Sequence, residues 1–101
     1  MKIWIDDVRP APENYLWYVS VNATKEAIEF IEKNFGKNYI ELIDIDHDAG
    51  VHADNGGDYI RILDWLEETG RNYPIRIHSM NPVGVENMRR IIQKNGWTEV
   101  R

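Results

Sequence analysis

Two short apolar segments of this chain end abruptly in acidic residues, and this pattern constrains the fold more than any other feature. Lys2-Ile3-Trp4-Ile5 runs directly into Asp6-Asp7, and the segment from Ile40 to Ile45 runs into Asp46-His47-Asp48. Short, β-prone apolar runs are typical of strands buried within a parallel sheet. Both segments are therefore predicted to be strands whose carboxyl ends open on polar chemistry.

Apolar spacing and capping residues predict the remaining elements. Further strands are expected at residues 16–21, 74–79 and 97–100, and helices at residues 24–36, 59–70 and 81–96. Pro10 and Pro12 exclude a regular helix after the first strand, so a loop is expected there. Strands that alternate with helices form right-handed crossovers. We expect one α/β domain over residues 1–101, with a parallel sheet of about five strands and helices on both faces.

Composition narrows the possible functions. The formal net charge of -5 argues against binding duplex DNA through a broad basic face. The chain has no cysteine, so a metal site would have to use oxygen and imidazole ligands. The first residues do not resemble a secretory signal, and nowhere do about 18 apolar residues run together. We expect a cytoplasmic protein that does not associate with membranes.

Polar residues at three predicted strand ends form the main functional signal. Ligands of open parallel sheets bind beyond the carboxyl ends of the strands. Asp6-Asp7, Asp46-His47-Asp48 and His78-Ser79 would meet there. Carboxylates at close range repel one another unless a cation or protons neutralise them, and Mg²⁺ is the simplest solution. Mn²⁺ or Zn²⁺ would also suit the histidines, whereas the alternative interpretation makes the acids ordinary turn residues.

Several other side chains have two interpretations each. His78 would be either a general acid or base or a strand histidine bonded to its neighbours. Arg9 would bind a substrate phosphate or pair with an acid, and Asn81 would present an anion site or simply begin a helix. His52 is expected to be a solvated loop residue. The four tryptophans are expected to be buried or half-buried residues rather than base-stacking platforms.

Three segments of the chain together resemble a known family. Residues 4–10, 46–50 and 76–84 resemble the cyclic-phosphate-processing receiver-like domain, and the match spans nearly the whole chain. This resemblance implies a receiver-like (flavodoxin-like) fold whose first helix is reduced to a loop. Asp6, Asp7, Asp46 and Ser79 match the acids and the hydroxyl of ordinary receivers, which bind Mg²⁺ and accept phosphate on the residue matching Asp46. No lysine ends the last strand, where only Arg101 remains, which argues against a phosphorelay role.

The resemblance implies that the protein processes cyclic phosphates on RNA ends or nucleotides, as in RNA repair. The leading hypothesis is a metal-dependent phosphoesterase in which a divalent ion, Mg²⁺ or Mn²⁺, is bound by Asp6, Asp7 and Asp46. His47, His78 and Asp48 would be the catalytic residues, and Arg9, Ser79 and Asn81 would bind the phosphate. The alternatives are a sensor that binds a phosphorylated or cyclic nucleotide without turnover and a degenerate receiver that acts as a protein interaction module.

Overall fold

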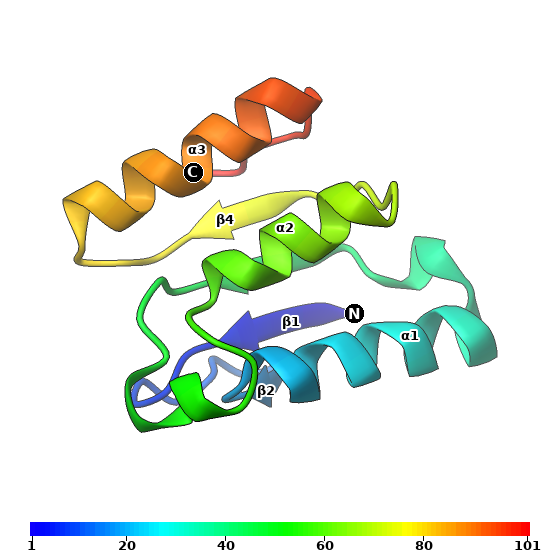
Figure 1. Ribbon diagram of the computed structural model, residues 1–101. Coiled ribbons are helices and arrows are strands. Elements are labelled where there is room, and N and C mark those ends of the chain that lie inside the picture. Colours follow the sequence, from blue (N-terminus) through cyan, green and yellow to red (C-terminus); the bar gives the residue numbers. More distant parts are fainter.

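Four parallel strands form the centre of the protein in the computed structural model, which describes residues 1–101 (Figure 1). The strands are β1 (Lys2–Ile5), β2 (Tyr15–Tyr18), β3 (Leu42–Ile45) and β4 (Ile75–Ile77). The helices are α1 (Val21–Phe35), α2 (Ile60–Glu68) and α3 (Pro82–Asn95), with short 3₁₀ helices η1 (Lys37–Tyr39) and η2 (Gly50–Asp54). None of the helices has both the length and the apolar run needed to cross a membrane.

The strand order β2-β1-β3-β4 is that of a flavodoxin-like sheet up to its fourth strand. A fifth strand is reduced to one bridge between Ile75 and Glu99, in which the Ile75 N–H donates to the Thr98 carbonyl and the Val100 N–H donates to the Ile75 carbonyl. The sheet therefore has four strands rather than about five. The expected parallel α/β architecture is confirmed.

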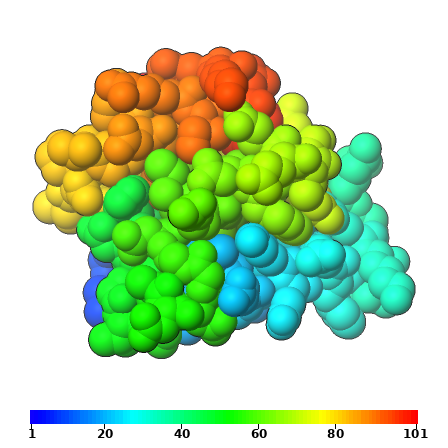
Figure 2. All heavy atoms as spheres, viewed as in Figure 1, coloured from blue at the N-terminus to red at the C-terminus, as the bar shows by residue number.

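All three helices cover the same face of the sheet. The core joins Ile3, Ile5, Ile43 and Ile45 of the sheet to apolar residues of α1, α2 and α3. The connections from β2 to β3 and from β3 to β4 both move the chain across the sheet in the same direction. Right-handed crossovers in one direction put every helix on the same face of the sheet (Figure 1). Figure 2 shows this face, with α1 and α2 packed side by side. The expectation of helices on both faces was wrong, because the connection that would carry a helix across the other face is a loop.

The other face of the sheet carries no helix, and we call it the helix-free face. Trp4 pairs in register with Trp17 and with Asp44, and Asp44 pairs with Arg76, so these four side chains form one row across it. The loop from residue 6 to residue 14 replaces the first helix, and its Arg9 carbonyl accepts a hydrogen bond from the Trp4 indole at 2.8 Å. The short loop thus covers only part of this face.

Two predicted boundaries shift because of local hydrogen bonds. Helix α1 begins earlier than expected, since Ser20 is the N-cap and its hydroxyl accepts from the Ala23 N–H. Thr24 lies inside the helix, buried, and donates to the Ser20 carbonyl at 2.8 Å. The second strand consequently ends at Tyr18 rather than at Val21. The predicted ends of α1 at Gly36 and of α3 at Gly96 are confirmed.

Candidate active site

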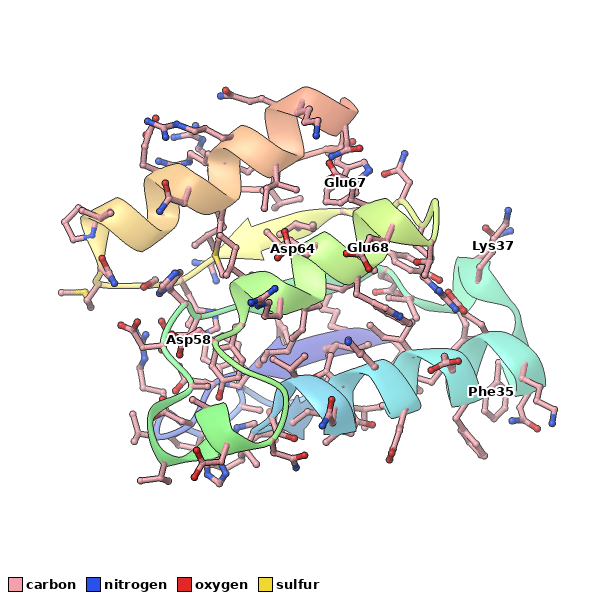
Figure 3. The ribbon with its side chains drawn as sticks, viewed as in Figure 1. Phe35, Lys37, Asp58, Asp64, Glu67 and Glu68 are labelled. Atoms are coloured by element: carbon pink, nitrogen blue, oxygen red, sulfur yellow. The ribbon has the colours of Figure 1, made fainter.

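The sheet ladder brings the polar strand ends together. The Asp46 N–H donates to the Ile5 carbonyl and the His78 N–H donates to the Ile45 carbonyl, each at 2.9 Å. Asp6, Asp46 and His78 therefore stand side by side just beyond β1, β3 and β4. In Figure 3 the labelled Asp58 lies at the end toward which the strands point, and Lys37 lies at the opposite end. The structure confirms the predicted convergence of the polar strand ends at the carboxyl edge of the sheet.

Asp6 is fully buried, and nitrogen donors surround its carboxylate. Oδ1 accepts from the backbone N–H groups of Val8 and Arg9, each at 2.9 Å. Oδ2 accepts from the Arg9 Nε at 3.0 Å and lies 2.9 Å from the His78 Nε2. Burial alone would raise the pKa of Asp6, but these hydrogen bonds and the Arg9 charge together bring its pKa below the usual range. Asp6 is thus stabilised as an anion.

His78 lies between two buried carboxylates. Its Nδ1 is 2.6 Å from Asp44 Oδ1, while its Nε2 faces Asp6. The ring stacks on Trp4, with centroids 3.8 Å apart and planes 4° from parallel, and only 7% of the side chain is exposed. His78 therefore has no ring nitrogen left for a substrate.

Ion pairs within the protein balance the charges of this cluster. Arg9 pairs with both Asp6 and Asp46, at 3.0 and 3.3 Å, and Arg76 pairs with Asp44 at 3.0 Å. With His78 bridging Asp6 and Asp44, three acids face three basic side chains. Burial would lower the pKa of Arg9, but Asp6 and Asp46 raise it above its usual value. Each of the three acids thus already has a basic partner within the protein.

A divalent ion does not fit this arrangement as it stands. Three possible ligand atoms lie within 4.8 Å of one another, one each from Asp6, Asp46 and His78, and one ion could bridge this spacing. However, both Asp6 oxygens already accept two N–H donors each, and the Arg9 guanidinium pairs with the two carboxylates that would bind the ion. A metal would have to displace Arg9, so the predicted Mg²⁺ or Mn²⁺ stays a prediction.

Replacing Arg9 by alanine tests this competition directly. We expect Mn²⁺ to leave the thermal midpoint of the wild-type protein unchanged and to raise that of Arg9→Ala, because the variant removes the guanidinium that pairs with both Asp6 and Asp46. Thermal unfolding with and without millimolar Mn²⁺ measures this. Arg76→Ala is the matched control, since it removes a cation from Asp44 only. A wild-type midpoint that Mn²⁺ raises as much as that of Arg9→Ala would show that Arg9 does not exclude the ion.

His47 has a different environment from His78. Its Nδ1 is 2.8 Å from Asp48 Oδ1, its side chain is 15% exposed, and its Nε2 has no hydrogen-bond partner in the protein. The ring packs on the first turn of α3, where a Cβ added at Gly84 would overlap the His47 Cγ. The carboxylate orients one ring nitrogen and leaves the other free, as a general acid or base requires.

Gly84→Ala is expected to destabilise the protein although alanine normally stabilises a helix by about 1 kcal/mol. The added methyl would collide with the His47 ring, and overpacking of this kind costs about 1–3 kcal/mol. Urea unfolding measures the difference. Val83→Ala, an exposed neighbour in the same turn, should change the free energy of unfolding by about 0.5 kcal/mol or less. A Gly84→Ala protein more stable than wild type would contradict the packing described.

The other predicted residues lie around this centre. Asp7 is not in the three-residue group; its carboxylate lies against Gly50, where a Cβ would be 2.5 Å from Oδ2. Asn81 caps α3 by accepting from the Gly84 N–H at 3.0 Å, and the Ser79 hydroxyl accepts from the Asn81 N–H at 3.1 Å. The Asn81 amide lies 3.4 Å from Asp48. His52 lies in η2, away from these contacts.

Tyr59 is fully buried beneath the acidic edge and donates from its hydroxyl to the Val19 carbonyl at 2.7 Å. Burial raises its pKa, and the charges of Asp7, Asp6, Asp46 and Asp58 raise it further. The ring therefore stays neutral.

The site is an open edge rather than an enclosed cavity. The largest pocket, of about 450 Å³, lies at the opposite end of the sheet, where Lys37, Glu41 and Arg71 are among its lining residues. Pockets of about 430 and 350 Å³ lie along α1 and α2. None of the three includes Arg9, His47 or His78. A ligand at the carboxyl edge would bind on the surface.

Sequence reasoning missed two members of the charge cluster, Asp44 and Arg76. Asp44 interrupts the apolar run Ile43-Asp44-Ile45 and is completely buried. An acid within a buried strand has to be paired, and this was the signal that could have found it. Arg76 is its partner on the neighbouring strand.

The comparison with protein families agrees with this geometry. The model of the cyclic-phosphate processing receiver domain matches residues 1–94. The chain belongs to this family. Neither the curated proteins nor the solved structures gave a match. As a cyclic-phosphate processing receiver domain, the chain keeps the receiver-like sheet and its acidic edge, while Arg9, Arg76 and His78 surround the acids with basic side chains.

Proposed function

We propose that this protein hydrolyses cyclic phosphates on RNA ends or nucleotides. The observation that carries the proposal is the His47–Asp48 pair, which has a free Nε2 at the edge where the family residues gather. The family match to cyclic-phosphate processing supports the same substrate class. In the cell, such an activity would act in RNA repair.

The reaction adds water to the phosphorus of a five-membered cyclic phosphate. The bond from phosphorus to one ribose oxygen breaks, and that oxygen takes up a proton, so the product is a 2′- or 3′-phosphomonoester. His47 would accept the proton of the attacking water at Nε2 or donate one to the leaving oxygen, and Asp48 would hold the ring in place. One P–O bond forms to the oxygen of water and one breaks to the ribose oxygen; His47 exchanges one of the two protons, solvent water exchanges the other, and the net change is one proton moved from the attacking water to the leaving oxygen.

Arg9 is the cation best placed for the phosphate. Its side chain is 43% exposed although it pairs with Asp6 and Asp46, so part of the guanidinium remains accessible at the edge. Guanidinium groups bind phosphate oxygens and stabilise the charge that develops in the transition state. The hydroxyl of Ser79 and the amide of Asn81 lie on the neighbouring turn and would add neutral donors.

His78 has a positioning role in this proposal. Its contacts with Asp6 and Asp44 fix the carboxylate that in turn aligns Arg9. The open edge also suits the substrate, because the end of an RNA chain approaches a surface site more easily than an enclosed pocket.

The proposal is tested by incubating the protein with 2′,3′-cyclic AMP and with RNA that ends in a cyclic phosphate. Each reaction is run with Mg²⁺, with Mn²⁺ and with chelator, and the end groups are identified. Turnover to a phosphomonoester supports the enzyme. Ligand binding without turnover would favour the sensor hypothesis instead. If the protein neither binds nor turns over these compounds, the interaction-module hypothesis is the one that is left.

A further inference from the structure

The helix-free face carries accessible aromatic and cationic side chains next to the Asp6–Arg9 pair. We propose that Trp17 is a stacking site for the nucleobase of the substrate, so that this face binds the nucleoside while the carboxyl edge binds the phosphate. The inference rests on the proposed function and specifies its substrate class as nucleotides with an unpaired base.

Trp17 is both held in place and accessible. Its Nε1 donates to the Asp6 carbonyl at 2.8 Å, and its side chain lies in register with Trp4 on the helix-free face. It is nevertheless 42% exposed, whereas Trp4 is 8% and Trp97 is 9% exposed. An indole fixed by its polar end and open on its apolar surface loses little conformational freedom when a base stacks on it.

Trp17 lies close to the proposed phosphate site. The same residue, Asp6, accepts the indole N–H at its carbonyl and pairs with the Arg9 guanidinium through its carboxylate. A base that stacks on Trp17 would therefore have its ribose and phosphate near Arg9. Base and phosphate of one nucleotide would be bound by two neighbouring groups.

The charges on this face complement a nucleotide rather than an apolar partner. Lys2 lies with its ammonium 5.6 Å from the centroid of the Tyr15 ring, and Tyr15 meets Trp4 edge to face at 5.8 Å. The side chains of Arg76 and Arg9 are 44% and 43% exposed, while Asp44 and Asp6, their acidic partners, are buried. Aromatic rings combined with cations are the usual features of surfaces that bind single-stranded nucleic acid. The cations on this face are thus exposed while their acidic partners are buried, although the whole chain has a net charge of -5.

Two probes separate the base from the phosphate. 2′,3′-Cyclic AMP contains both, and glycerol 1,2-cyclic phosphate has the same five-membered cyclic phosphate without a base. Dissociation constants are measured by calorimetry on a His47→Ala background, in which turnover should be slow. Trp17→Ala should weaken binding of 2′,3′-cyclic AMP by about 5- to 150-fold. It should leave binding of glycerol 1,2-cyclic phosphate unchanged.

Further variants separate stacking from a structural role. Trp17→Phe keeps an aromatic ring without the N–H and should retain most of the affinity, whereas Trp17→Leu should be as weak as Trp17→Ala. Leu16→Ala is the matched control, since Leu16 is 37% exposed on the same strand but faces the other side of the sheet. It should not affect either probe.

Each contrary result overturns the inference in a recognisable way. Equal losses for both probes in Trp17→Ala, or a Trp17→Phe protein as weak as Trp17→Ala, would show that the indole only positions Asp6. No loss for either probe would leave the face to a protein partner or to solvent, while the phosphate site and the proposed function stand. If the unsubstituted protein binds neither probe and turns over neither, the inference and the proposed function fall together.

Discussion

His47→Ala is expected to lower turnover of 2′,3′-cyclic AMP by about 10²- to 10⁴-fold while the protein stays folded, because a positioned general acid or base contributes a factor of that size. The reason lies in its contacts. Nδ1 is bound to Asp48 and Nε2 is free, so the ring is oriented and still able to exchange a proton with the substrate. The measurement is kcat from end-group analysis, with the folded state checked by circular dichroism.

Two matched variants make this prediction specific. His52→Ala removes a histidine that lies in η2, away from the charge cluster, and should leave kcat unchanged. Asp48→Asn should reduce kcat less than His47→Ala does, since Asp48 orients the ring and its own side chain is 60% exposed. Wild-type kcat in His47→Ala would remove His47 from the mechanism.

His78→Ala should act on stability instead, lowering the free energy of unfolding by about 3–5 kcal/mol. Removal of the ring would leave Asp6 and Asp44, both fully buried, without the group that bridges them. It would also open a cavity beside Trp4, on which the ring stacks. For a domain of this size the expected loss is a large part of the total stability. Urea unfolding measures it, with His52→Ala as the histidine control.

A double-mutant cycle separates the charge effect from the cavity. Asp44→Asn removes one of the two carboxylates that His78 bridges, so part of the cost of His78→Ala should disappear in the double variant. If His78→Ala costs less than about 1 kcal/mol, or if the two substitutions are additive, the buried ion pairs are not what stabilises this edge of the sheet.

The sheet and the convergence of its polar ends could be predicted because both depend on local patterns. Apolar runs that end in acids identify β1 and β3, and Asn81 with Pro82 and Gly96 bounds α3. The carboxyl ends of neighbouring parallel strands must meet, so the strand ends that carry Asp6, Asp46 and His78 were correctly placed at one edge, although the predicted metal ligands were Asp6, Asp7 and Asp46. The prediction did not need the direction of any side chain.

The charge balance of the site could not be predicted in the same way. It depends on Arg9 folding back over three residues to Asp6 and on Arg76 facing Asp44 across a register that only the folded sheet fixes. The sequence showed an excess of acids and therefore suggested a metal. The single helical layer was missed for a related reason. The loop after β1 was predicted, but the prediction did not take into account that a loop in place of a helix leaves one face of the sheet without helices.

The short chain segment that links Asp6 to Arg9 keeps the two side chains paired whatever ions the solution contains. Because Arg9 follows Asp6 by only three positions in the chain, the guanidinium is always present near the carboxylate at an effective concentration on the order of millimolar or higher. A freely diffusing ion is bound only as far as its supply allows. The charge balance of this edge is therefore built into the chain, and it would persist where free divalent ions are scarce.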